Sequence, residues 1–174
     1  MTFPVFDLHC DTALALLGKN FQGEGDLKKN TNHIDLERAS RLPGYAQCFA
    51  CFTSTWDRLP TGLSVADVFE REMIVILREI EKYHHMIRLA YSADDVKQNC
   101  DAGLMSAVLT IEGPAGFGFD PALLEDLYNV GFRISTLGWN EKNALCGSHT
   151  TGGGLTDMGR EYVKEAQRMG MIID

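Results

Sequence analysis

The sequence predicts an α/β fold with a parallel sheet, of the (β/α)8 barrel type. Short apolar runs alternate with amphipathic stretches, as expected when each strand is followed by a helix. The run 105–111, MSAVLTI, is almost continuously apolar, which is typical of a buried parallel strand. Polar residues follow the predicted strands, where α/β barrels place their chemistry. A doubly wound sheet is the alternative, because it also binds ligands at the carboxyl ends of its strands.

The composition is that of a single soluble domain. The 174 residues are 45% hydrophobic and 23% charged, and the net charge is −8. That charge argues against nucleic acid as a partner and, more weakly, against an anionic membrane surface. The N-terminal residues do not resemble a signal peptide, and no apolar stretch approaches about 18 residues, so we expect a cytoplasmic protein without a membrane segment. The chain has five cysteines, and because the number is odd and the expected location is cytoplasmic, we expect free thiols rather than disulfides.

The first expected strand is the apolar run 3–8, which leads into His9-Cys10-Asp11. Residues two apart on a strand point to the same side, so an imidazole and a carboxylate would lie side by side. Both groups are good zinc ligands. The alternative is that His9 and Asp11 only hydrogen-bond to each other and cap the strand.

The remaining elements follow from periodicity and capping residues. Ser64, Ser92 and Thr156 are expected to open helices, and Gly131 and Gly170 to end them. The expected helices cover residues 12–17, 36–42, 65–86, 93–102, 121–130 and 157–169. The expected strands cover residues 45–53, 105–112, 132–137 and 171–174, and a brief apolar piece at 87–91 separates two of the helices.

Other polar or reactive segments have simpler explanations. Asp35, in a second H-x-D, is expected to cap the next helix. The Cys48-x-x-Cys51 motif lies inside an apolar run, which favours packing in the core. Residues 18–32 and the glycine-rich stretch 146–154 are expected to be loops, and the latter lacks the spacing of a phosphate-binding loop.

Candidate ligands follow three of the expected strands. His9 and Asp11 follow the first, Glu112 ends the strand 105–112, and the segment 139–143 follows the strand 132–137. In a parallel barrel these ends converge on one rim, which strengthens the metal interpretation of the H-x-D pair. A carboxylate such as Glu112 can bridge two metal ions about 3.5–4 Å apart.

The sequence resembles the membrane (renal) dipeptidase family, zinc dipeptidases of the amidohydrolase-like superfamily. The matching pieces are DLHCDT (7–12), IEG (111–113), GFRISTL (131–137) with Trp139, Asn140 and Asn143, and the stretch 154–174. Their order and spacing extend over nearly the whole chain.

The resemblance implies a site with two zinc ions. His9 and Asp11 match the ligands of one ion, and Glu112 matches the carboxylate that bridges both, so catalysis is expected to depend on Asp11 and Glu112. The implied reaction is hydrolysis of a dipeptide by a metal-bridging hydroxide, with a D-residue tolerated at the C-terminal side in many members. The matching segment after 137 makes Trp139, Asn140 and Asn143 candidate substrate-binding residues.

One departure from the family concerns Trp139. Several members have a histidine there that helps to stabilise the developing oxyanion, whereas an indole N–H can only donate a hydrogen bond. Asn140, or a residue of the 146–154 stretch such as His149, is the candidate to take over that role.

A second departure concerns length. The family's further ligand histidines, its substrate-binding arginine and its acid/base aspartate have no counterpart, and such a barrel needs roughly 250 residues. We therefore expect residues 1–174 to be the N-terminal part of a single barrel domain, truncated after the strand 171–174 and holding one zinc ion or none by itself. Its expected partner is a complementing C-terminal chain or a second copy in a homodimer. The alternatives are an inactive half-barrel that binds a metal or a partner, and a related enzyme acting on another amide or a lactone.

Overall fold

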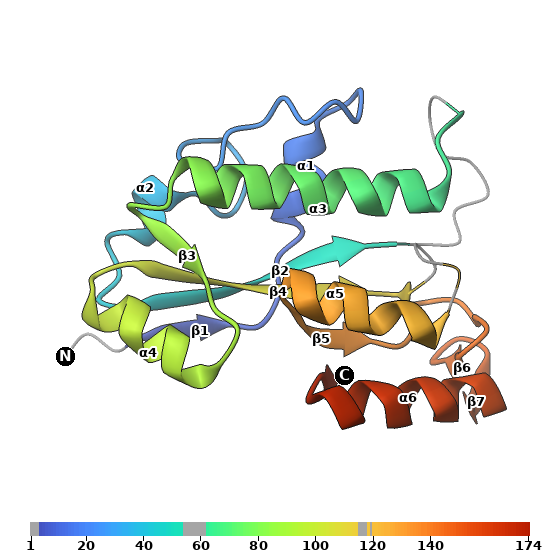
Figure 1. The fold of residues 1–174 in the computed structure, drawn as a ribbon. Coiled ribbons are helices and arrows are strands. Elements are labelled where there is room, and N and C mark those ends of the chain that lie inside the picture. The colour runs from blue at the N-terminus through green and yellow to red at the C-terminus, as the bar shows by residue number, and fades with distance from the viewer. Residues whose placement is uncertain (1–3, 54–61, 115–117, 119) are drawn as a thin grey trace. The chain divides into compact units, whose positions relative to one another are not determined.

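The computed structural model describes residues 4–53, 62–114, 118 and 120–174 (Figure 1). Two compact units are distinguished: Met1–Cys51 with Arg71–Leu109, and Phe52–Glu70 with Thr110–Asp174. Strands β2 (Tyr45–Phe52) and β4 (Met105–Glu112) and helix α3 (Val65–Lys82) each contribute residues to both units. No helix within the described ranges has both the length and the hydrophobicity that a membrane crossing requires.

The first unit contains the beginning of the sheet. Its other elements are β1 (Val5–Asp7), α1 (Thr12–Leu17), α2 (Leu36–Ala39), β3 (Ile87–Leu89) and α4 (Ala93–Asp101). Strand β1 pairs in parallel with β2, with Val5 opposite Tyr45, and β3 pairs in parallel with β4. All eight residues of β2 are buried, as expected for a parallel strand covered on both faces.

The second unit contains the later elements. They are the 3-10 helix η3 (Pro121–Leu123), α5 (Leu124–Val130), β5 (Phe132–Thr136), β6 (Cys146–Ser148), β7 (Gly152–Leu155), α6 (Asp157–Met169) and β8 (Ile172–Ile173). Strands β5 and β8 are parallel, whereas β6 and β7 form an antiparallel pair. Phe132 and Tyr162 are fully buried in this unit, and the Tyr162 hydroxyl lies 2.9 Å from the Ser135 hydroxyl.

The strand order distinguishes the two folds that the sequence allows. The order in the sheet is β1-β2-β4-β5-β8, which follows the order along the chain. A barrel adds its strands in chain order, whereas a doubly wound sheet reverses direction part of the way through. The prediction of a parallel α/β sheet of the barrel type is therefore confirmed.

Most predicted helix starts are also confirmed, because they depend on local capping chemistry. The Ser64 hydroxyl accepts a hydrogen bond from the Asp67 N–H at 3.1 Å, and Thr156 accepts one from Gly159 at 3.0 Å. Gly170 ends α6 in the left-handed conformation. The predicted cysteine packing is confirmed as well: Cys48 and Cys51 are buried free thiols, and burial raises the pKa of Cys48 to about 11.

Three expectations need correction, the first being the helix 36–42, which ends already at Ala39. The stretch 146–154 is not a plain loop, because β6 and β7 pair within it. A Cβ on Gly147 would lie 1.9 Å from the carbonyl oxygen of Gly152, so the pairing depends on the very glycines that suggested a loop. Helix α3 ends at Lys82 rather than near residue 86, since the N–H groups of Met86 and Ile87 both turn back to the carbonyl of Tyr83.

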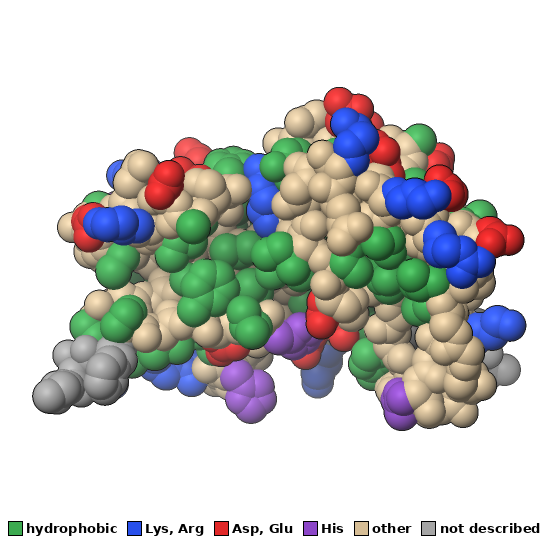
Figure 2. Space-filling view, turned by 90° about the horizontal axis from the view of Figure 1, so that it is seen from below, with side chains coloured by type: hydrophobic (Ala, Val, Ile, Leu, Met, Phe, Trp, Pro, Cys, Tyr) green, Lys and Arg blue, Asp and Glu red, His purple; other side chains and the backbone are tan. Residues whose placement is uncertain are grey.

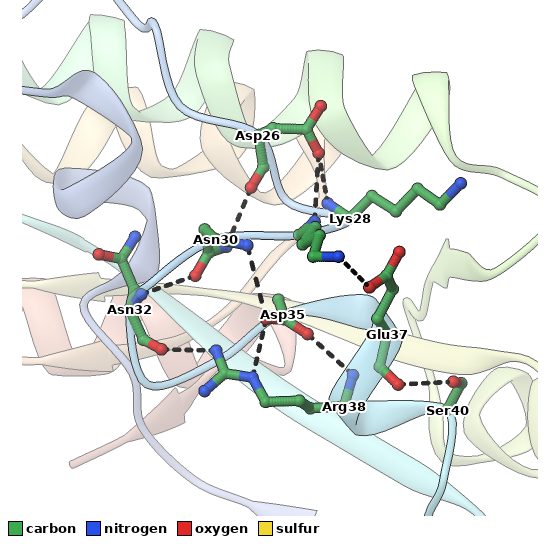
Figure 3. A network of polar contacts seen from close by, with 9 residues as sticks. Asp26, Lys28, Asn30, Asn32, Asp35, Glu37, Arg38 and Ser40 are labelled. Carbon is green, nitrogen blue, oxygen red and sulfur yellow. Dashed lines mark hydrogen bonds and ion pairs between the residues drawn. The ribbon is translucent and has the colours of Figure 1, made fainter.

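Polar contacts fasten the loop 18–35 to its own residues and to α2 (Figure 3). The N–H of Leu27 also donates to Glu79 Oε2 of α3 at 2.9 Å. Buried Asp35 accepts hydrogen bonds from the N–H and Nε of Arg38, both at 2.8 Å, so the predicted cap is confirmed. Asp26 accepts hydrogen bonds from the Tyr83 hydroxyl at 2.7 Å and from Lys82 Nζ at 2.9 Å. Partial burial disfavours the Asp26 carboxylate, but these bonds outweigh it and lower its pKa to about 2.

These contacts predict that Asp26→Asn destabilises the fold in a pH-dependent way. A lowered pKa in the folded state gives stability that is present above the ordinary value of 3.8 and lost as the pH falls toward 2. At neutral pH we expect a loss of up to about 1 kcal/mol in the free energy of unfolding, since a partly exposed charge is screened. Urea unfolding from about pH 7 to pH 2 checks this, with the exposed Glu81→Gln as control. An Asp26→Asn effect that stays constant over that range would contradict the assignment.

Candidate metal centre

In the first unit, the structure brings His9 and Asp11 together. His9 Nε2 lies 3.2 Å from Asp11 Oδ1, and the two side chains are 49% and 63% exposed. Asp11 occupies the cap position of α1, but its carboxylate makes no capping hydrogen bond to the helix. The carboxylate is therefore turned toward the imidazole and the solvent rather than used to start the helix.

The backbone that leads to this pair contains a one-residue bulge in place of the regular strand that the sequence suggested. Asp7 lies opposite Gln47, whereas Cys10 donates to the carbonyl of Cys48 at 3.1 Å and accepts from the N–H of Ala50 at 3.0 Å. Leu8 and His9, which follow β1, thus lie opposite the single residue Cys48. A bulge of this kind redirects side chains and is frequent next to functional sites.

Asp7 belongs to the DLHCDT motif, but the sequence analysis predicted no role for it. Asp7 Oδ1 accepts a hydrogen bond from the backbone N–H of His9 at 3.2 Å. The carboxylate thus engages the backbone of the predicted ligand. A sequence signal for this contact exists, since aspartate often bonds to the N–H two residues later.

In the second unit, Glu112 is the last residue of β4 and is half-buried. Its carbonyl accepts a hydrogen bond from the Thr53 N–H at 2.9 Å, and the next N–H, of Gly113, donates to Thr136 at 3.0 Å. Gly113 has φ +76°, and a Cβ there would lie 2.7 Å from the Thr53 carbonyl oxygen. Only glycine fits this turn, which fixes the backbone immediately after Glu112.

The predicted substrate-binding segment follows β5. Trp139 is 48% exposed and packs edge-on against Phe52, with ring centroids 5.3 Å apart. The carbonyl of Asn140 accepts a hydrogen bond from the Ser148 hydroxyl at 2.8 Å. His149 is exposed on the turn between β6 and β7.

Asn143 organises this segment with its side-chain amide. Its Nδ2 donates to the carbonyl of Leu137 at 2.8 Å, and its Oδ1 accepts from the N–H groups of Leu145 at 2.8 Å and Cys146 at 3.1 Å. These contacts hold the start of β6 close to the end of β5. A substrate-binding role for Asn143 stays a prediction.

The candidate ligands fit zinc by their chemistry. His9 offers an imidazole nitrogen, and Asp11 and Glu112 each offer a carboxylate oxygen. Imidazole nitrogen and carboxylate oxygen are common zinc donors in hydrolytic sites. The same set can activate water or polarise a carbonyl group through the bound ion.

Comparison with known proteins identifies a family of peptidases. The family model described as "Membrane dipeptidase (Peptidase family M19)" matches residues 1–174. Dipeptidase tcpJ of Claviceps purpurea is 28% identical over 168 residues, which cover 88% of this chain and 38% of the relative. Dipeptidase verJ of Clonostachys rogersoniana is 25% identical over 153 residues, covering 82% and 39%. The chain thus spans about two fifths of the length of these relatives.

Two solved structures share the fold. A metallopeptidase from Rhodobacter sphaeroides, liganded with a phosphinate mimic of the dipeptide L-Ala-D-Ala, is 24% identical with a TM-score of 0.82, and the match covers 100% of this chain and 58% of that one. The probable dipeptidase PvdM from Pseudomonas aeruginosa is 19% identical with a TM-score of 0.80, covering 98% and 46%.

The contacts of Asn143 predict that Asn143→Ala lowers the free energy of unfolding by about 1–2 kcal/mol, because two half-buried N–H groups and one carbonyl lose their partner. Asn143→Asp keeps the acceptor and should lose less. Chemical denaturation of both variants measures the difference, with the neighbouring Asn140→Ala as control. Equal stability of Asn143→Ala and the unchanged protein would show that the amide does not hold this segment.

Proposed function

Because the chain belongs to the membrane dipeptidase family, peptidase family M19, we propose that it forms the first part of a zinc dipeptidase. In this proposal His9 and Asp11 would hold one zinc ion, and Glu112 would supply a carboxylate to it and to a second ion. The family resemblance seen in the sequence is confirmed, so the chain is a member of a hydrolase family. The ligand assignment and the reaction are our inference.

The observation that carries the proposal is the His9–Asp11 pair at the carboxyl end of the first strand. The pair is accessible, its two ligand groups already face each other at 3.2 Å, and the carboxylate is not used to cap α1. Glu112 ends another parallel strand of the same sheet, as expected for a ligand in a barrel. Bound zinc would supply Lewis acidity, which lowers the pKa of water and polarises the scissile carbonyl.

The substrate that we propose is a dipeptide, including one with a D-residue at its C-terminal side. The relative from Rhodobacter sphaeroides is liganded with a mimic of L-Ala-D-Ala, which supports this substrate class. Trp139 presents an exposed indole beside Phe52, a surface suited to an apolar substrate side chain. Its N–H can donate to a substrate oxygen but cannot exchange a proton in catalysis, so we assign it binding rather than acid/base chemistry. Asn140 is the neighbouring polar candidate for the same task.

We further propose that hydrolysis requires the other part of the barrel. Within the described residues, β1 lies at the end of the strand order and pairs only with β2. Val5, Phe6 and Leu8 are 39%, 50% and 70% exposed, and Figure 2 shows hydrophobic side chains reaching the surface. An exposed apolar strand edge favours pairing with another strand. A C-terminal segment or chain of the kind present in the longer relatives would cover it, and a homodimer is the alternative.

The ligand assignment predicts that Asp11→Ala and Glu112→Gln each weaken zinc binding by about 10–100-fold or more, with little effect on folding. The first variant loses a carboxylate donor, and the second replaces a carboxylate donor by a neutral amide. Isothermal titration of the 174-residue chain with zinc measures this, and circular dichroism reports the fold. The matched control is Asp101→Ala, which removes an exposed carboxylate of α4 that pairs with Lys97. Zinc affinity unchanged in Asp11→Ala would remove the basis of the proposed site.

The reaction itself is tested on protein that contains both parts of the barrel. Zinc-dependent release of amino acids from L-Ala-L-Ala and L-Ala-D-Ala is expected, and Asp11→Ala should abolish it. Cleavage of other amides or lactones without dipeptide hydrolysis would instead favour the related-enzyme alternative. Zinc binding with no hydrolysis of any of these compounds would favour a half-barrel that only binds metal.

A further inference from the structure

We propose that Asp7 is a positioning residue of the metal site, whose carboxylate fixes the backbone of His9 and thereby the direction of its imidazole. The inference rests on the proposed function, because it concerns how that site is held. Asp7 is not itself assigned as a ligand.

The bulge explains why His9 needs such a partner. In the regular part of the ladder, Val5 donates its N–H to the carbonyl of Gly44. After Asp7 the extra residue shifts the pattern, and the carbonyl of Cys48 receives the N–H of Cys10 instead. The N–H of His9 is thereby displaced from the ladder, and Asp7 Oδ1 accepts it at 3.2 Å.

Asp7 is in turn placed by two buried polar side chains of β2. Tyr45 is 8% exposed, Gln47 is fully buried, and the Tyr45 hydroxyl donates to Gln47 Oε1. The same hydroxyl lies 3.4 Å from Asp7 Oδ2, and Gln47 Nε2 donates to the carbonyl of Cys48 at 3.0 Å. Burial, with a smaller contribution from Asp7, raises the pKa of Tyr45, so the hydroxyl keeps its proton and remains a donor.

The network therefore connects the carbonyl that anchors Cys10 with the carboxylate that anchors His9. Polar networks of this kind hold a single geometry when their members are satisfied. Residues that orient metal ligands typically change metal affinity by about 10–100-fold when they are removed. Asp7 acts on the ligand through the backbone N–H, which distinguishes it from a carboxylate that only adds negative charge.

Two substitutions separate these roles. Asp7→Ala removes both the acceptor and the charge, whereas Asp7→Asn keeps a carbonyl oxygen for the His9 N–H and removes only the charge. We expect Asp7→Ala to weaken zinc binding by about 10–100-fold and Asp7→Asn by less than about 3-fold. Zinc titration of the 174-residue chain measures both, with Asp101→Ala as the control for loss of a carboxylate.

Amide hydrogen exchange of His9, followed by NMR without added metal, gives a second readout. Exchange at His9 should accelerate about tenfold or more in Asp7→Ala and remain close to that of the unchanged protein in Asp7→Asn. If Asp7→Ala does not fold, Asp7→Asn alone tests the inference by retention of both properties.

Equal losses of affinity in the two variants would overturn the inference, because they would assign the effect to charge. Unchanged affinity and unchanged His9 exchange in Asp7→Ala would also overturn it. A different result, in which the unchanged protein binds no zinc, would defeat the proposed function, while the exchange rates would still decide whether Asp7 holds the His9 backbone.

Discussion

The geometry of the candidate site depends on the hydrogen bonds that join Cys10 to β2. The Cys10 N–H binds the carbonyl of Cys48, and the Cys10 carbonyl receives the N–H of Ala50. These bonds hold the chain between His9 and Asp11 against a fully buried strand. The two candidate ligands on either side are exposed, while both backbone groups of the residue between them are hydrogen-bonded to β2. Such anchoring favours a preorganised metal site.

The same constraint explains the bulge. A strand that continued the register of Val5 and Asp7 would give the His9 N–H to β2, and the imidazole direction would follow the ladder. Because Leu8 and His9 both lie opposite Cys48, the backbone hydrogen bonds to β2 stop before His9. They resume at Cys10, between the two candidate ligands. The cost of the interruption is one displaced N–H, which the Asp7 carboxylate accepts.

At the end of β4, the backbone next to the candidate ligand Glu112 is held in a different way. Here the strand is regular through Glu112, and Gly113 allows the backbone to pass within van der Waals distance of Thr53. Both arrangements place a candidate ligand where a parallel strand ends, which is the position that barrel enzymes use for chemistry. The greater length of the relatives and the exposed apolar edge of β1 are what led us to propose that further strands complete the site.

Much of this arrangement could be predicted from the sequence, because it is encoded locally. Capping residues such as Ser92 and Thr156 marked helix starts, and the apolar run of β4 marked a buried strand. The β6–β7 pair could not be predicted, since the glycines that permit it carry no alternation of side chains. The bulge at Leu8 and His9 was equally hidden, because it depends on the register with a strand about 40 residues away.

The central claim is that His9, Asp11 and Glu112 bind zinc together. Anomalous diffraction at the zinc absorption edge, from crystals of the zinc-loaded chain, tests it most directly. The account predicts a peak within about 2.0–2.2 Å of a His9 ring nitrogen and of carboxylate oxygens of Asp11 and Glu112. A zinc peak bound by other residues, with no ring nitrogen of His9 and no carboxylate oxygen of Asp11 within bonding distance, would contradict it.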